Sequence, residues 1–222
     1  MKKMLQKLFL FALCLTLALS PAVSNVVGGT TITAQAATKS GLVKKNGKYY
    51  YYKNGKKVTN TWKTVTTTSK SGKKTKNKYY FGSNGVAVMA KSTTNATYNI
   101  KLKTIKGKKY GFDTKARLVS GIYVNENNLK FYYFNSKGVY NAAKSKTLRA
   151  AATEGADLAV LESLLESMIG ERGSRTESTS CLPVGDSDTM YIFITLEYEH
   201  FTVCGLREPD STVETVYYVY PN

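Results

Sequence analysis

Aromatic and polar residues follow one another in a short pattern early in the chain. The stretch 48–59 reads KYYYYKNGKKVT, an aromatic run that leads into Asn54-Gly55 and continues with polar residues. Tyrosine has a high strand propensity, and Asn-Gly readily supplies the two positive-φ positions of a tight turn. Because side chains alternate along a strand, Tyr49 and Tyr51 share one face. The pattern predicts a β-hairpin that turns at Asn54-Gly55.

The same pattern recurs three times further along the chain. A tyrosine stands six residues before Gly55, Gly85 and Gly138, and an aromatic residue stands four residues before each of them. A degenerate copy has Ala116 at the glycine position and Gly111 where the other copies have a tyrosine. Successive turns are 30, 31 and 22 residues apart, so the pattern is a repeat with insertions.

These copies predict a repeat architecture over residues 38–144. A lone hairpin is marginally stable in water, so neighbouring hairpins are expected to stack into a β-hairpin solenoid with nearest-neighbour contacts. We interpret the polar stretch 64–77 as a long loop or a twisted polar hairpin, and the partly alternating stretch 96–103 as an extra strand. The predicted core of the stack is aromatic and consists of Tyr51, Phe81, Phe112 and Phe134.

Residues 145–222 have a different pattern, which predicts a small α+β domain. One helix is expected to begin at 145–152, and a second at 157–169, where leucines recur at helical spacing before Gly170. A helix packed on an antiparallel sheet is the expected fold. The strands are predicted at 189–196, 198–204 and 213–220. The whole chain is therefore expected to be mainly β, with a repeat followed by a small α+β domain.

The first 36 residues differ in composition from the rest. Three lysines precede the apolar run 8–19, and small residues stand at 34–36, where a signal peptidase would cleave. This pattern predicts a secretory signal peptide at residues 1–36 and a mature chain that starts at Ala37. The alternative is a retained membrane helix, but the apolar run is shorter than the roughly 20 residues that span a bilayer. We expect a secreted protein without stable membrane insertion.

Charge divides the remaining chain into two parts. Residues 38–150 contain 26 lysines and arginines and two acidic residues, whereas residues 151–222 contain 13 acidic residues and three arginines. Such asymmetry is typical of separate modules. A basic secreted module favours an anionic partner, such as teichoic acid, another wall polyanion or an acidic polysaccharide. Charge alone also allows nucleic acid, which the predicted signal peptide argues against, or lysines that only keep the sheet soluble.

Two cysteines remain once the signal peptide is removed, Cys181 and Cys204. Because the mature chain is expected outside the cell, we predict a disulfide between them. It would stabilise a small core by about 3 kcal/mol in the chain-entropy model. The alternative is two separately buried thiols.

The residues of the first copy also resemble a known family. The order Asn-Gly-Lys-Tyr-Tyr-Tyr, the turn at Gly55, Lys-Lys-Val-Thr and then Trp62 is similar to the cell-wall-binding repeats of Gram-positive secreted proteins, of the choline-binding and glucan-binding type. The likeness covers residues 41–144. It implies stacked hairpins in which choline head groups or glucans are held on aromatic side chains between successive hairpins, and it implies a place at the cell wall.

The chain departs from this family where a choline cage would form. The tryptophan that the family has seven residues before the turn glycine is replaced by a lysine in three copies and by a phenylalanine in the fourth. A lysine at that place repels a cation and favours an anion. The predicted ligand-binding residues are Trp62, Tyr50, Tyr80, Phe131 and Tyr133, all expected to be exposed, together with Lys48, Lys78 and Lys109.

Candidate catalytic and metal-binding residues are few. His200 is the only histidine, and we interpret it as a surface residue of a strand. One histidine and two cysteines are too few for a zinc site, and Asp186 and Asp188 are interpreted as part of a turn. We therefore expect no metal, no cofactor and no catalysis. The main hypothesis is a secreted, wall-associated protein whose repeats bind a cell wall polymer, such as teichoic acid or glucan, or a surface polysaccharide.

Two further hypotheses stay open. In the first, the C-terminal domain binds a protein partner or acts as an inhibitor, and the repeats serve only as a tether. In the second, the chain is an enzyme with a carboxylate site among Glu197, Glu199 and Glu208, for which the separation of the carboxylates would decide the chemistry.

Overall fold

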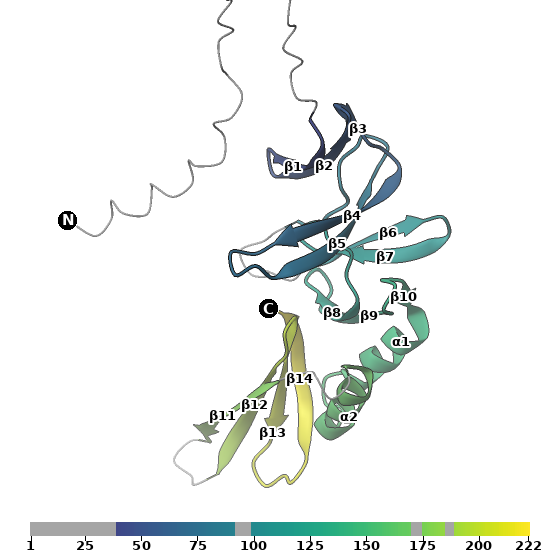
Figure 1. Cartoon of the computed structure of the whole chain (residues 1–222). Coiled ribbons are helices and arrows are strands. Elements are labelled where there is room, and N and C mark those ends of the chain that lie inside the picture. Colours follow the sequence, from purple (N-terminus) through teal and green to yellow (C-terminus); the bar gives the residue numbers. More distant parts are fainter. Residues whose placement is uncertain (1–38, 92–98, 170–174, 185–188) are drawn as a thin grey trace, which may run out of the picture. The chain divides into compact units, whose positions relative to one another are not determined.

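The computed structural model of the chain describes residues 39–91, 99–169, 175–184 and 189–222. Residues 39–222 form one compact unit. The fold is mainly β: antiparallel hairpins come first, and two helices with a four-stranded sheet follow (Figure 1). This is the expected fold class. No helix among the described residues is long and apolar enough to cross a membrane.

Four hairpins make up the repeat region, and each is antiparallel. Their strands are β1 (Gly41–Lys45) with β2 (Lys48–Lys53), β4 (Thr61–Thr68) with β5 (Lys74–Phe81), β6 (Lys101–Ile105) with β7 (Lys108–Phe112), and β8 (Gly121–Asn125) with β9 (Lys130–Phe134). The degenerate copy is therefore a complete hairpin, β6–β7.

The long hairpin of the first copy closes one turn earlier than the sequence pattern predicts. Five residues of β1 pair with β2 across Asn46-Gly47, whose φ angles are 49° and 72°. The predicted turn at Asn54-Gly55 does form, with φ angles of 49° and 76°, but it leads only into the two-residue strand β3 (Lys56–Lys57). Both Asn-Gly pairs suit a tight hairpin turn, so the local sequence signal alone does not show which of them closes the longer hairpin.

The repeated glycine position marks a turn into a short return segment in every copy. After β5 the segment pairs through Phe81 and Ala87, and after β7 through Phe112 and Leu118. After β9 it is the strand β10 (Tyr140–Asn141). Ala116 occupies the glycine position with φ 61°, a left-handed conformation that side chains rarely adopt. The copy that lacks the glycine thus keeps the backbone geometry of the turn.

The return segments join each hairpin to the one before it. The N–H of Ala87 donates to the carbonyl of Tyr49 at 2.9 Å, and the N–H of Leu118 donates to the carbonyl of Lys78 at 2.8 Å. A bridge between Tyr110 and Val139 makes the third connection. The hairpins therefore stack in tandem, which confirms the predicted solenoid.

The two stretches between the copies both turn out to belong to hairpins. The polar stretch 64–77 contributes to β4 and β5, so the interpretation as a twisted polar hairpin is confirmed. In the stretch interpreted as an extra strand, residues 96–98 lie outside the described residues, and Lys101 begins β6, the first strand of the degenerate copy.

The C-terminal part contains the helices and the larger sheet. The helices are α1 (Ala142–Ala151) and α2 (Leu158–Ile169), and the strands are β11 (Thr176–Pro183), β12 (Met190–Glu197), β13 (Phe201–Arg207) and β14 (Glu214–Pro221). The sheet is antiparallel in the order β11-β12-β13-β14. The Asn141 side chain accepts a hydrogen bond from the N–H of Lys144 and caps α1, so this helix begins three residues earlier than expected.

Two strand predictions in this part need correction. The expected strand 198–204 begins instead at Phe201, because the N–H of Tyr198 bonds the carbonyl of Phe201 and closes the turn between β12 and β13. β11 lies where no strand was expected. All eight of its residues are exposed, and its sequence lacks the apolar alternation by which a strand is identified.

One hydrophobic core unites the helices, the sheet and the last hairpin. Leu158, Leu161 and Leu165 of α2 are buried, as their spacing predicts, and pack with residues of β12, β13 and β14. The same core includes Phe131 and two further residues of the β8–β9 hairpin. The predicted domain boundary at residue 144 therefore falls within a stretch that shares a continuous core.

The predicted disulfide is wrong: Cys181 is an exposed free thiol, and Cys204 is a buried one. Cys181 lies opposite Ile192 and Cys204 opposite Thr195, so β12 separates their strands. Neighbouring strands are about 4.8 Å apart, which puts the two Cα atoms at least about 9 Å from each other. A disulfide bridges at most about 7 Å.

Some predictions lie outside the described residues. These are the signal peptide at residues 1–36, the end of the second helix at Gly170, and the turn at Asp186 and Asp188.

Candidate functional site

Trp62 lies at the centre of an aromatic cluster between the second and third hairpins. Its ring centroid is 5.1 Å from that of Tyr80, its cross-strand neighbour, and 5.1 Å from that of Tyr110. The ring also stacks on Phe112 at 5.8 Å and an interplanar angle of 25°. Trp62 is half-buried, so it holds two hairpins together and keeps part of its surface accessible.

Lysine ammonium groups cover the aromatic faces of the repeats. The Nζ atom of Lys78 lies 4.7 Å from the centre of the Trp62 ring, within the range of a cation–π interaction. Tyr50 is half-buried and has Lys57 Nζ at 5.5 Å from its ring centre. The protein's own cations therefore occupy the faces on which an external cation would sit.

The last hairpin repeats this arrangement with lysines of α1 and of the third hairpin. Lys144 Nζ lies 4.6 Å from the centre of the Tyr133 ring, and Lys109 Nζ lies 5.4 Å from that of Tyr140. The Tyr133 side chain is half-buried and packs on the C-terminal core, and its backbone N–H donates to Ser145 Oγ at 2.9 Å. Tyr133 thus helps to hold α1 in place, and its aromatic ring also contacts the ammonium group of Lys144.

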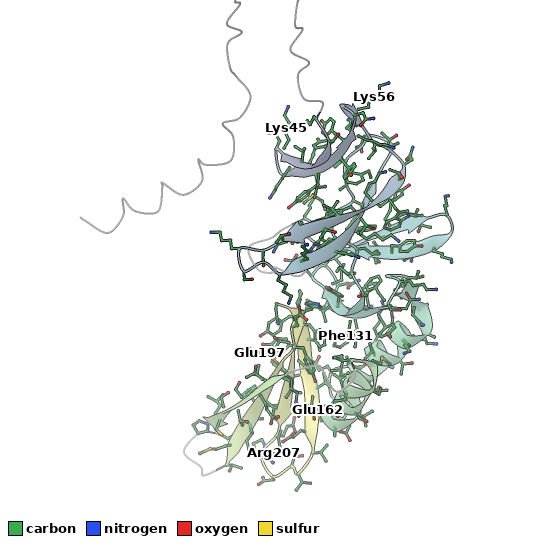
Figure 2. The ribbon with its side chains drawn as sticks, in the orientation of Figure 1. Lys45, Lys56, Phe131, Glu162, Glu197 and Arg207 are labelled. Carbon is green, nitrogen blue, oxygen red and sulfur yellow. The ribbon has the colours of Figure 1, made fainter. Side chains whose placement is uncertain are left out.

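Phe131 is fully buried, so the expectation that it is exposed is wrong. Its ring meets Phe201 of β13 edge-on, with centroids 5.0 Å apart, and it lies between β9 and the C-terminal elements (Figure 2). The lysines at the equivalent position of the other copies are exposed, but here Phe201 of the C-terminal sheet covers the side chain. Phe131 is a core residue of the junction.

A basic groove lies among the first three hairpins. Its volume is about 720 Å³, and its rim carries the four lysines Lys48, Lys91, Lys101 and Lys103. The floor is the segment 82–90, which contributes Val86, Val88 and Met89. None of the described residues that line the groove is acidic. The groove therefore presents ammonium groups around a partly apolar floor.

The fold fixes the floor of this groove with backbone hydrogen bonds. Asn84 Oδ1 accepts from the N–H of Val86 at 2.9 Å and shapes the turn after β5. The N–H of Ala90 donates to the carbonyl of Asp113 at 3.0 Å, which attaches the end of the segment to the next repeat. Ala87 and Ala90 are each 2% exposed, so their methyl groups anchor the segment in the stack.

Of the three predicted lysines, the structure brings one into this groove. Lys48 lies on its rim, whereas Lys78 and Lys109 lie over the rings of Trp62 and Tyr140. The sequence interpretation missed Lys91, Lys101 and Lys103, because they come from other copies and from outside the repeated pattern. The sequence signal that could have identified them is their concentration in lysine-rich stretches before and within the third copy.

A second, smaller cavity of about 250 Å³ lies where the third repeat meets the turn after β12. Asp113, Arg117, Glu199 and His200 line it, and Arg117 Nε pairs with Asp113 Oδ2 at 2.6 Å. The His200 ring stacks on that of Tyr123, with centroids 4.4 Å apart. His200 lies in the turn after β12 and not in a strand, as was expected. Burial lowers the pKa of His200, which favours the neutral imidazole.

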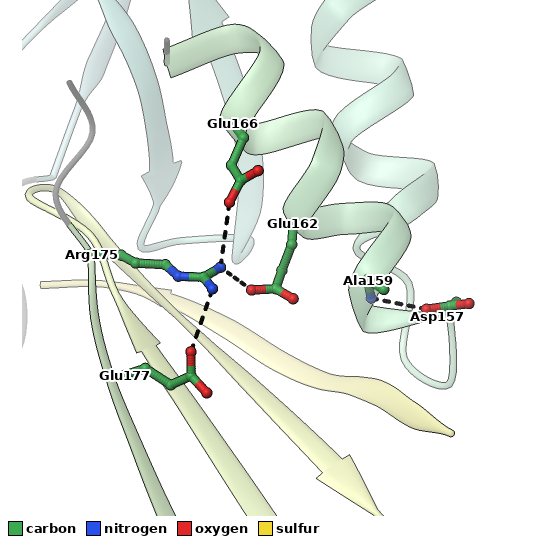
Figure 3. A network of polar contacts seen from close by, with 6 residues as sticks. All are labelled: Asp157, Ala159, Glu162, Glu166, Arg175 and Glu177. Carbon is green, nitrogen blue, oxygen red and sulfur yellow. Dashed lines mark hydrogen bonds and ion pairs between the residues drawn. The ribbon is translucent and has the colours of Figure 1, made fainter. Parts of the chain in front are cut away.

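A cluster of carboxylates on α2 is tied to the sheet by one arginine. Arg175 pairs with Glu162 and contacts Glu166 at 3.9 Å and Glu177 at 3.4 Å (Figure 3). Burial raises the pKa of Glu162, and the attraction of Arg175 offsets that rise only in part. The cluster fastens β11 to α2. Across the described ranges, no three acidic, histidine or cysteine side chains group as metal ligands would.

Comparisons with known proteins give no family assignment. No protein family and no curated protein matches the chain. Among solved structures, it is similar to choline binding protein F from Streptococcus pneumoniae, crystallised with a peptidoglycan analogue, at 22% identity and a TM-score of 0.23 over 46% of this chain and 38% of that one.

Two sucrases give similar values. The truncated alternansucrase from Leuconostoc mesenteroides matches at 18% identity and a TM-score of 0.28, over 75% of this chain and 11% of the enzyme. An alternansucrase in complex with isomaltotriose matches at 18% identity and a TM-score of 0.20, over 47% of this chain and 10% of the other. The chain thus spans less than half the length of each structure. At these TM-scores the likenesses carry no weight for function.

Proposed function

We propose that this protein is a secreted, non-catalytic protein of a cell surface, and that its repeats bind an anionic wall polymer or surface polysaccharide in the groove rimmed by Lys48, Lys91, Lys101 and Lys103. The observation that carries this proposal is that four lysines from three segments lie around one groove, whose described lining residues include none that is acidic. Like charges repel, so such a cluster is costly unless an anion fills it.

The size of the groove supports a ligand of several sugar or polyol units. Its volume is about 720 Å³. Its apolar floor at Val86, Val88 and Met89 suits the carbon faces of sugar or polyol units, while the lysines suit the charged groups. Cell wall polymers and acidic polysaccharides combine these two features.

The aromatic sites support an anionic ligand over a choline head group. Lys78 occupies the face of Trp62, and Lys57 occupies that of Tyr50. A quaternary ammonium would have to displace these cations and would then lie beside them. The repeats are therefore proposed to bind without choline.

The test is binding of the chain from Ala37 onward to purified Gram-positive cell walls and to an immobilised teichoic acid, over a series of salt concentrations. Wild-type protein is expected to bind, with an affinity that falls as salt rises and does not respond to added choline. The variant Lys91→Glu, Lys101→Glu, Lys103→Glu is expected to lose at least about tenfold in affinity, because three attractive charges become repulsive.

The matched control carries the same change of charge away from the groove. Lys70→Glu, Lys73→Glu, Lys74→Glu alters exposed lysines at the tip of the β4–β5 hairpin and should bind with nearly wild-type affinity. Equal losses in both triple variants would mean that net charge alone, and no particular site, causes binding. No retention of the wild-type chain at low salt would refute the proposed function.

A further inference from the structure

The C-terminal sheet has one protected edge and one open edge. Along β14, the N–H of Gly155 donates to the carbonyl of Val216 at 2.8 Å, and the N–H of Val216 donates to the carbonyl of Ala156 at 2.7 Å. The segment before α2 thus pairs with this edge at Thr215 and Val216. The opposite edge is β11, all of whose residues are exposed and which, among the described strands, pairs with β12 alone.

The register shows which backbone groups of β11 point away from the sheet. The N–H of Val184 donates to the carbonyl of Thr189, so this pair exchanges hydrogen bonds with the neighbouring strand. Bonded and non-bonded pairs alternate along an antiparallel ladder. Pro183, which has no N–H, accordingly falls in a non-bonded pair. The alternation then places the N–H and C=O groups of Glu177, Thr179 and Cys181 on the open edge.

This edge has none of the usual protection against pairing. Exposed edges are commonly blocked by lysines, by a bulge or by an internal proline. β11 contains no lysine, its register with β12 is unbroken, and its one proline is the last residue. Its one charged residue, Glu177, is paired with Arg175. In the repeats, by contrast, every hairpin carries lysines on its strands.

We propose that β11 is a self-association site, at which two copies of the chain pair antiparallel about Thr179 and join their sheets into one. In this register Thr179 faces Thr179 of the second copy, and Glu177 faces Cys181. All three open N–H groups and all three open C=O groups of each copy then find partners. A shift of two residues would bring Pro183, which lacks a donor, into a bonded position.

The side chains favour a second copy in this orientation. Antiparallel pairing puts the acidic end of one β11, near Glu162 and Glu177, beside the apolar end of the other. Leu182, which is 56% exposed, would be covered by Thr176 of the second copy. Parallel pairing would instead place the two Glu177 carboxylates close together. Like charges directly opposite one another destabilise a strand pair.

The proposed register excludes a disulfide as the cause of pairing. The two Cys181 residues would lie four positions apart along the strands, or about 13 Å. The dimer should therefore form equally well with and without a reductant. A dimer held by Cys181 would need a different register.

The experiment is sedimentation velocity of the chain from Ala37 onward at increasing concentration, in high salt and without polymer. The wild-type chain should show a monomer–dimer equilibrium that reductant and Cys181→Ser leave unchanged. Thr179→Pro removes only a donor that β12 does not use, so the sheet stays intact while the dimer weakens by about tenfold or more. Thr179→Lys should do the same by placing two lysines face to face.

Thr153→Lys is the matched control, because it adds the same charge to the C-terminal part away from β11 and should dimerise like the wild type. Circular dichroism and thermal unfolding verify that each variant is folded. A wild-type chain that stays monomeric at every concentration overturns the proposal. So does a dimer that survives Thr179→Pro, or one that Cys181→Ser abolishes.

Discussion

The repeats and the C-terminal part obtain their stability in different ways. In the repeats, small clusters lie between neighbouring hairpins, and rings contact rings, such as Tyr49 with Tyr79 and Tyr51 with Phe81. The C-terminal part has one large core in which leucines of α2 meet valines, isoleucine and leucine of the sheet. A stack of local contacts tolerates irregular spacing between copies, whereas a single core couples all its elements.

The β8–β9 hairpin belongs to both kinds of structure. Tyr123 and Phe134 contribute to a cluster of the repeats, whereas Val124 and Phe131 contribute to the C-terminal core. Alternate residues of one hairpin thus face two different environments. The last repeat is therefore the element through which the two parts stabilise each other.

The largest expected effect tests whether damage in the repeats stays local. Phe81→Ala removes a fully buried ring that contacts Tyr51 and Tyr79, and should lower the free energy of unfolding by about 3–5 kcal/mol. Because contacts in a stack are between neighbours, hydrogen exchange should accelerate in β1 to β5 and stay slow in β12 and β13.

The matched variant in the C-terminal core should behave in the opposite way. Leu161→Ala, at a site without exposure, should accelerate exchange in β12 and β13 and also in β8 and β9, since all share its core. Thr66→Ala and Val160→Ala, at exposed positions on β4 and α2, serve as controls. Uniform acceleration along the chain in Phe81→Ala would show that the two parts unfold as one.

A smaller effect concerns the degenerate copy. A Cβ atom added at Gly111 would lie 2.6 Å from Phe134 Cζ and 2.7 Å from Val119 Cγ2. Gly111→Ala should therefore cost about 1–3 kcal/mol in urea unfolding by overpacking the contact between the third and fourth hairpins. Gly82→Ala is the control, because its nearest neighbour would be 3.7 Å away. A neutral Gly111→Ala would show that the hairpins can separate without cost.

The smallest expected effect concerns pH and the acidic part alone. Burial raises the pKa of Glu162 in the folded state, so the folded state binds this proton more tightly than the unfolded state does. This contribution to stability is fully present below the ordinary glutamate pKa and is lost as pH rises through the raised folded value. Glu162→Gln should flatten that part of the pH profile of unfolding, measured between about pH 4 and 7. An unchanged profile would show that Glu162 does not cause it.

The sequence by itself determined that the repeats are hairpins and about where the helices lie. A period of two next to a turn signal such as Asn54-Gly55 acts over a few residues, and so does the leucine spacing of α2. These signals are local, because strand alternation and helix periodicity depend only on near neighbours in the chain. They also identified Phe81, Phe112 and Phe134 as core residues, since each copy repeats the same environment.

Only the tertiary structure decided the features that depend on contacts between segments far apart in the sequence. Phe131 is buried because β13 covers it, β11 is a strand because β12 provides its hydrogen bonds, and Cys181 and Cys204 stay apart because of the sheet register. The basic groove likewise exists because stacking brings Lys48 near Lys91 and Lys101. Such neighbours are far apart in the sequence, and no local pattern encodes which of them will meet.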